Sequence, residues 1–144
     1  DTVIRVNLRG TFLMCKVFGQ HLIDAGHGGS IVNISSIAGK LLPPNTTAYS
    51  ASKAGIQALT AGMAQEVGRY KIRVNAICPG LVDTVRIDDI RGTPAWDQAT
   101  ARIALHRMGA GEGIAHAVMF LCSGQGAWFT GQSINLDGGH AVQH

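Results

Sequence analysis

Short β-branched runs alternate with longer segments of helical apolar spacing along the whole chain, and this alternation constrains the fold most strongly. In the first segment, apolar side chains recur at helical intervals from Val3 to Leu22, until Gly26 and two further glycines end the pattern. The same reasoning predicts helices over residues 48–69, 94–106 and 112–122, and strands over residues 30–36, 71–78 and 132–136. Strands separated by helices are typical of a parallel α/β sheet, so we expect a single α/β domain over residues 1–144.

The composition fits one folded domain and excludes two other classes of protein. Of the 144 residues, 46% are hydrophobic and 15% are charged, against about 25% charged in an average soluble domain. Disorder is therefore excluded as the main state. A membrane-spanning helix needs roughly 18 uninterrupted apolar residues. No run in this sequence approaches that length.

Charge and cysteine content argue against a nucleic-acid-binding protein and favour a reduced intracellular one. The formal charge is +3 and the sequence pI is 9.0, but the basic residues are scattered singly, which argues against nucleic-acid binding. Cys15, Cys78 and Cys122 lie far apart, and an odd number of cysteines is typical of a reduced intracellular chain. The first residues have neither the basic nor the apolar region of a secretory signal. We therefore expect a cytoplasmic location.

One constellation of side chains indicates chemistry. Tyr49 and Lys53 share a face at the start of the helix over 48–69, and Ser36 precedes them at the end of a strand. A phenol is a poor acid or base at neutral pH, but an adjacent ammonium and a helix N-terminus both favour the phenolate. The pair can then exchange a proton with an alcohol or a carbonyl. Ser36 would hold the same substrate oxygen, at the edge where open α/β sheets bind ligands.

Four motifs follow one another along the chain: Asn33 to Ser36, Tyr49 to Lys53, Asn75 to Gly80 and Thr130 to Gly139. In order and interval they resemble the short-chain dehydrogenase/reductase family, in its smaller single-domain branch. The resemblance covers nearly all 144 residues. It implies a Rossmann-like fold, NAD or NADP as cofactor, and interconversion of a secondary alcohol and a ketone by hydride transfer, as in 3-oxoacyl thioester reductases and related alcohol dehydrogenases. It leaves the choice of NAD or NADP and the identity of the substrate open.

The resemblance implies roles for individual positions. Tyr49 looks like the proton donor or acceptor, Lys53 like the residue that assists its ionisation and binds the nicotinamide ribose, and Ser36 like the ligand of the substrate oxygen. Asn7 resembles the asparagine that holds a water in the proton relay. The further cofactor contacts implied are Val6 beside the adenine, Ile34 along the nicotinamide, Pro79 and Gly80 in the turn after the second strand, Val82, whose backbone would bind the carboxamide, and Thr84.

The sequence departs from the family at its beginning. The first strand and the glycine-rich turn that receives the pyrophosphate have no counterpart here. The glycines from Gly109 to Gly113 follow a helix, and Ile114 replaces the last glycine of G-x-G-x-x-G, so we interpret them as a turn between helices. We therefore expect the C-terminal part of a doubly wound fold, whose first strand lacks a neighbour on one side. Such a chain would be part of a longer enzyme or would depend on a partner piece.

Partners and metals are the remaining expectations. Six histidines, at positions 21, 27, 106, 116, 140 and 144, lack metal-ligand spacing with a supporting carboxylate, so no metal site is predicted. The polar stretch from Asp83 to Gly92 is predicted to be a loop, and it resembles the family's substrate-binding loop. The helices over 2–25 and 48–69 resemble the pair that forms a four-helix dimer contact, which implies a dimer or tetramer.

Three functions fit these features. The first is an NAD(P)-dependent oxidoreductase that acts on a small alcohol or carbonyl substrate. The alternative is a non-catalytic oligomerisation or regulatory fragment of such an enzyme, suggested by the missing phosphate-binding turn. Epimerase or dehydratase chemistry on the same Tyr-Lys pair is disfavoured, because a chain that ends soon after Asp137 has no room for an extra substrate domain.

Overall fold

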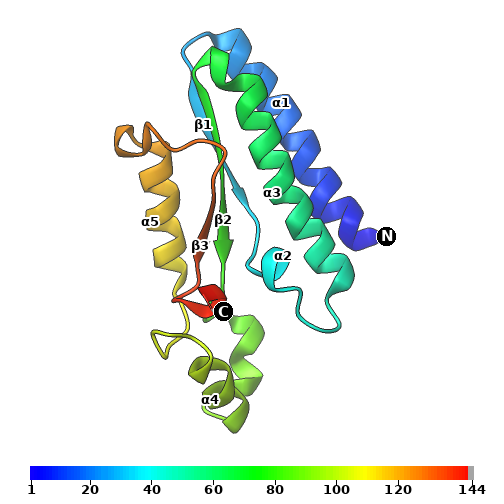
Figure 1. Cartoon of the computed structure of the whole chain (residues 1–144), viewed down its shortest axis with the longest axis vertical. Coiled ribbons are helices and arrows are strands. Elements are labelled where there is room, and N and C mark those ends of the chain that lie inside the picture. The colour runs from blue at the N-terminus through cyan, green and yellow to red at the C-terminus, as the bar shows by residue number, and fades with distance from the viewer. Residues whose placement is uncertain (143–144) are drawn as a thin grey trace.

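Three parallel strands form the centre of the molecule, with helices on both faces (Figure 1). The computed structural model describes residues 1–142. The strands are β1 (Gly29–Ile34), β2 (Ile72–Pro79) and β3 (Ser133–Leu136), hydrogen-bonded in the order β1-β2-β3. The helices are α1 (Gly10–Ala25), α2 (Ala38–Leu41), α3 (Thr47–Val67), α4 (Pro94–Ala101) and α5 (Gly111–Cys122). Helices α1 and α3 run side by side on one face of the sheet, and α5 covers the other (Figure 1). The predicted α/β class is thus confirmed.

The central strand β2 carries the core. Its residues Ile72, Val74 and Ile77 are at most 1% exposed, because both faces of the strand are covered and both edges are paired. A strand buried in this way reads as a nearly continuous apolar run, which is why its position could be predicted. Ile56 from α3 and Leu121 from α5 complete the core, each 1% exposed.

A buried polar group fastens α1 and α3 to β1. The Asn33 side chain on β1 accepts a hydrogen bond from the Cys15 thiol at 3.3 Å and donates to the Thr60 hydroxyl at 3.0 Å. Each of these side chains is at most 7% exposed. Because an unpaired buried amide would be costly, the three elements can pack in only one register.

Strand β1 lies at the edge of the sheet within the part of the chain that the structure describes, as the sequence predicts. Its register with β2 runs from Gly29 opposite Ile72 to Ile34 opposite Ile77. Strand β3 pairs with β2 from Ser133 opposite Ala76 to Leu136 opposite Pro79. The carboxyl ends of β1 and β2 therefore lie next to each other.

Three predicted elements need correction. The helix expected to run from Pro94 to His106 ends at Ala101, because the chain turns to bury Ile103 and to donate the Leu105 amide to the Gly138 carbonyl at 3.0 Å. The stretch expected to be a loop contains a 3-10 helix, Val85–Ile90. The first helix begins with a π-helical turn, Ile4–Arg9, rather than regular α-helix. No helix among the described residues is both long and apolar enough to span a membrane.

Candidate active site

The segment after β1 follows the end of β2. The Ser35 amide donates to the Ile77 carbonyl at 2.8 Å, and the Ile37 amide donates to the Pro79 carbonyl at 3.1 Å. These two bonds extend the β1–β2 pairing past the last residue of β1. Ser36 lies between them and is half-buried, and its hydroxyl accepts the Ala38 amide at 3.1 Å. The Ser36 O–H is therefore oriented by the backbone and keeps its proton for another acceptor.

Tyr49 and Lys53 share a face of α3 at its N-terminal end, as their spacing predicts. The Lys53 ammonium lies 5.7 Å from the centroid of the Tyr49 ring and donates to the Ile34 carbonyl at 3.0 Å. Tyr49 is 39% exposed, so its phenol is open to a ligand. The lysine thus bridges the tyrosine and the end of β1.

The buried Ser35 and the half-buried Gln57 hold this part of α3 against the end of β1. The Ser35 hydroxyl donates to the Lys53 carbonyl at 2.8 Å. The Gln57 amide donates to the Ser35 hydroxyl at 3.2 Å and to the Ser36 carbonyl at 3.1 Å. Helix α2 packs directly on the same turn, because Gly39 has no side chain to separate it from the backbone of Lys53 and Ala54. Sequence analysis missed Gln57, although its place one turn after Lys53 is a usable signal.

Asn7 reaches the same helix from the π-helical turn. Its amide nitrogen donates to the Ser52 hydroxyl at 3.1 Å, and that hydroxyl donates to the Tyr49 carbonyl at 2.6 Å. Ser52 is fully buried. Asn7 and Tyr49 are therefore joined through one serine, which the sequence analysis did not single out. A π-helical turn inside a helix is often found at a functional site.

The turn after β2 carries the remaining candidate residues. Gly80 approaches Asp137 so closely that a Cβ at position 80 would lie 2.7 Å from the Asp137 Cβ, so no other residue fits there without movement. Val82 pairs with Gly109 in an isolated parallel bridge, which the interpretation of 109–113 as a simple turn did not include. Thr84 is exposed, and within residues 1–142 no hydrogen bond joins its side chain to Tyr49 or Lys53.

The structure thus joins Lys53 to Tyr49 and Ile34, Asn7 to the Tyr49 backbone through Ser52, and the residue after Ser36 to Pro79, whereas Gly80 contacts Asp137. Val6, on the π-helical turn, is 62% exposed.

Two ionisable groups in this region are perturbed by burial. Burial lowers the pKa of the Lys53 ammonium, and the nearby Cys78 thiol acts in the opposite direction. Burial raises the pKa of the Cys78 thiol, against the effects of Lys40, Ser35, Ser36 and Lys53. A lysine whose proton is held less tightly is better placed to take part in a proton relay.

Among residues 1–142, no three histidine, cysteine, aspartate or glutamate side chains lie close enough to hold a metal ion. His144 falls outside the described residues.

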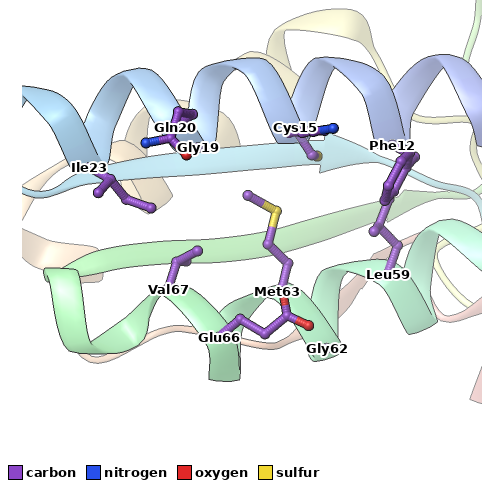
Figure 2. A pocket seen from close by; sticks show the side chains of 11 residues that line it. Phe12, Cys15, Gly19, Gln20, Ile23, Leu59, Gly62, Met63, Glu66 and Val67 are labelled. Atoms are coloured by element: carbon purple, nitrogen blue, oxygen red, sulfur yellow. The ribbon is translucent and has the colours of Figure 1, made fainter.

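A groove of 370 Å³ lies between α1 and α3, away from this site. Figure 2 shows Met63 reaching into it from α3, with Phe12 and Leu59 facing each other at one end. The two helices approach closely there, since a Cβ at Gly19 would lie 2.7 Å from the Met63 methyl carbon. The groove is mainly apolar and contains none of the candidate catalytic side chains.

Comparison with known proteins agrees with this geometry. Residues 1–141 match a family model described as enoyl-(acyl carrier protein) reductase. A short-chain type dehydrogenase/reductase from Mycobacterium ulcerans superposes with a TM-score of 0.92 at 34% identity, over 98% of this chain and 51% of that one. The chain belongs to the short-chain dehydrogenase/reductase family.

Other members of the short-chain dehydrogenase/reductase family are similar over the same length. The rat (3R)-3-hydroxyacyl-CoA dehydrogenase is 42% identical over 139 residues, which are 96% of this chain and 53% of that protein. A 4-hydroxyisoleucine dehydrogenase solved with NADH has a TM-score of 0.93 at 31% identity, over 98% of this chain and 58% of that one. The chain therefore spans about half the length of these relatives.

Proposed function

We propose that this chain carries the proton-transfer part of an NAD(P)-dependent oxidoreductase that interconverts a secondary alcohol and a ketone. One observation supports this most directly: Lys53 lies 5.7 Å from the Tyr49 ring while it is bonded to the Ile34 carbonyl at the end of β1, two residues before Ser36. In this proposal a phenol, an ammonium and a hydroxyl act together at the carboxyl end of the sheet. Three such groups suffice to bind one substrate oxygen and to exchange its proton.

Each side chain has a distinct role in this proposal. Tyr49 donates a proton to the carbonyl oxygen during reduction and accepts it during oxidation. Ser36 donates a hydrogen bond to the same oxygen, because its hydroxyl accepts the Ala38 amide and its proton bonds to no group among residues 1–142. Lys53 stabilises the negative charge that develops on Tyr49. Asn7 holds the turn that faces this helix and takes part in the relay that returns the proton to solvent.

The residues present fit the nicotinamide end of the cofactor. A lysine ammonium has three donors, and Lys53 uses one of them on the Ile34 carbonyl, which leaves two for ribose hydroxyls. Ile34, Pro79, Gly80, Val82 and Thr84 would line the nicotinamide, and Val6 would lie toward the adenine. When bound, NAD(P) supplies or accepts the hydride. The glycine-rich phosphate turn has no counterpart in the 144 residues, so the proposal concerns the nicotinamide end alone.

The substrate class follows from the relatives. The rat relative is named for 3-hydroxyacyl-CoA and the family model for an acyl carrier protein reductase, so we propose a 3-oxoacyl thioester or a related secondary alcohol.

Three free thiols support a reducing, cytoplasmic location.

A second copy of this chain is the proposed partner. Helix α1 exposes Met14, Val17 and Phe18, each more than half exposed. Val17 lies next to Lys16 and Gln20, which line the groove, whereas Met14 and Phe18 line a separate hollow against β1. Apolar surface of this kind on two neighbouring helices is typical of a contact between subunits. Pairing α1 and α3 with the same helices of another copy would cover the groove and the neighbouring Val17.

The decisive experiment is a titration of the 144-residue chain with NADH and NADPH, followed by nucleotide fluorescence, with circular dichroism as the test of folding. We expect binding by the folded chain. Tyr49→Phe should leave that binding nearly unchanged and should abolish most reduction of a 3-oxoacyl thioester in any preparation that shows it. Lys53→Met should weaken both. A folded chain that binds neither nucleotide would contradict the proposal and favour a non-catalytic oligomerisation or regulatory fragment.

A further inference from the structure

One arginine joins both ends of the segment between β2 and α4. Arg91 Nη1 donates to Asp83 Oδ2 at 2.7 Å, while Nη2 lies 2.7 Å from Asp83 Oδ1 and 2.6 Å from Asp88 Oδ1. The guanidinium carbon lies 5.7 Å from the centroid of the Trp96 ring. The Arg91 cluster consists of Asp83, Asp88, Arg91 and Trp96. The cluster closes residues 83–96 into a compact unit around the 3-10 helix Val85–Ile90.

Asp83 depends on this arginine. Its Oδ1 atom is buried and accepts no hydrogen bond within the described residues, so the ion pair with Arg91 is the interaction that offsets its charge there. The two side chains are 48% and 35% exposed, so this is a surface ion pair, whose loss has a small cost. Without Arg91, Asp83 Oδ1 loses this partner, and the closed arrangement of the segment becomes less stable.

Backbone hydrogen bonds also connect Asp83 to the turn that carries the candidate residue Val82. Its amide donates to the Gly109 carbonyl at 2.8 Å, and the Gly109 amide donates to the Leu81 carbonyl at 2.9 Å. This short parallel bridge includes Val82 and follows directly on the turn at Pro79 and Gly80. The Arg91 cluster therefore connects the polar segment to the residues proposed to hold the nicotinamide carboxamide.

We propose that Arg91 is a positioning residue that keeps residues 83–96, which include Thr84, closed and held next to the turn that carries Val82. The role of that turn rests on the proposed function, whereas the closure does not. A guanidinium suits this task because its planar fork pairs with one carboxylate through two nitrogens and still reaches a second carboxylate and an aromatic face. Lysine, a single point charge, cannot make all of these contacts.

The test is the rate of chymotrypsin cleavage after Trp96, identified by the masses of the fragments. When opening and closing are fast compared with cleavage, this rate follows the population of the open segment. Arg91→Met should raise the rate about two- to fivefold, the range expected when a surface ion-pair network is lost. Arg91→Lys should give an intermediate rate. Adding Asp83→Asn to Arg91→Met should restore part of the loss, because the unpaired charge is then gone.

The matched control is Arg69→Met, which removes the same charge from an arginine 4.9 Å over the Tyr70 ring, outside this segment. It should leave cleavage after Trp96 unchanged. Raising the NaCl concentration from ~0.05 M to ~1 M should accelerate cleavage of the unaltered chain and have little effect on Arg91→Met, since salt screens exposed ion pairs.

Equal cleavage of Arg91→Met and the unaltered chain would overturn the proposal, as would an equal rise in Arg69→Met. If circular dichroism shows that Arg91→Met fails to fold, the cleavage rate of Arg91→Lys and the salt titration of the unaltered chain test the proposal instead. Because none of these readouts needs a nucleotide, failure of the nicotinamide titration would leave this result standing, and the reverse also holds.

Discussion

Replacing Gly39 by alanine tests whether α2 positions the turn of α3 that carries Lys53. A Cβ at position 39 would lie 2.7 Å from the Ala54 backbone nitrogen and 2.9 Å from the Lys53 carbonyl carbon. Ordinary contacts begin at 3.4 Å, so one of the two helices must move by about 0.5–0.7 Å. Gln57 Nε2, also 2.7 Å away, can turn aside, but the other two obstructing atoms belong to the backbone, so side-chain rotation alone cannot relieve the overlap.

The expected cost follows from this overlap. Extra volume in a packed site costs about 1–3 kcal/mol, and alanine regains up to ~1 kcal/mol over glycine in a helix. Gly39→Ala should therefore reduce the free energy of unfolding by about 1–2 kcal/mol. Gly62→Ala is the matched control, because a Cβ at Gly62, within α3, meets nothing within 4 Å. That variant should gain about 0.5–1 kcal/mol from helix propensity alone.

The assay is urea unfolding at one low protein concentration, followed by far-UV circular dichroism. The two variants should differ in free energy of unfolding by about 1.5–3 kcal/mol, with equal dependence on urea. If Gly39→Ala is as stable as Gly62→Ala, then α2 does not press on the Lys53 turn, and the reasoning that Gly39 fixes the position of Lys53 fails.

Two further predictions concern pH and assembly. Burial raises the pKa of the Cys15 and Cys78 thiols above 9.0, so the folded state keeps protons that the unfolded state loses, and stability should fall as pH rises above about 9. In reducing buffer, urea midpoints from pH ~7.5 to ~10 should fall less steeply for Cys78→Ala, and an unchanged slope would contradict the assignment. Lys53, whose pKa is lowered, contributes in the opposite direction and is present in both proteins. In sedimentation velocity, Val17→Asp should shift the chain toward monomer, whereas Val85→Asp, at a valine that is 83% exposed, should not; a monomer before any substitution would remove the proposed second copy.

The elements that sequence analysis predicted well are those with strong periodicity. Strand β2 is mostly apolar because it is buried on both faces, although it includes Arg73 and Asn75, and its bounds differ from the prediction by one residue at each end. The pairing of Tyr49 with Lys53 could also be predicted, because their spacing of four residues depends only on the geometry of one helix. Local rules are sufficient for such features.

Features that depend on distant partners could not be predicted in the same way. Helix α4 ends at Ala101 because Ile103 turns into the core and Leu105 bonds to Gly138, a residue 33 positions further on. The Asn7 side chain bonds to Ser52, 45 positions away. The Arg91 cluster is local, but a polar stretch with several charges has no periodicity to show which of them will pair.

In the candidate site, some hydroxyls bond to the backbone and others keep their proton unused. The neighbouring serines Ser35 and Ser36 illustrate this difference. The Ser35 hydroxyl is 3% exposed, donates to the Lys53 carbonyl and accepts from Gln57, so its bonds fix backbone. Ser36, the next residue, only accepts from the Ala38 amide and keeps its own proton for a ligand. Ser52 and Tyr49 repeat the pattern on α3: the buried hydroxyl of Ser52 bonds to the Tyr49 carbonyl, and the Tyr49 phenol stays exposed. Because other side chains hold the backbone here, the proposed roles of the Tyr49 phenol and the Ser36 hydroxyl toward a substrate oxygen would require breaking none of these hydrogen bonds.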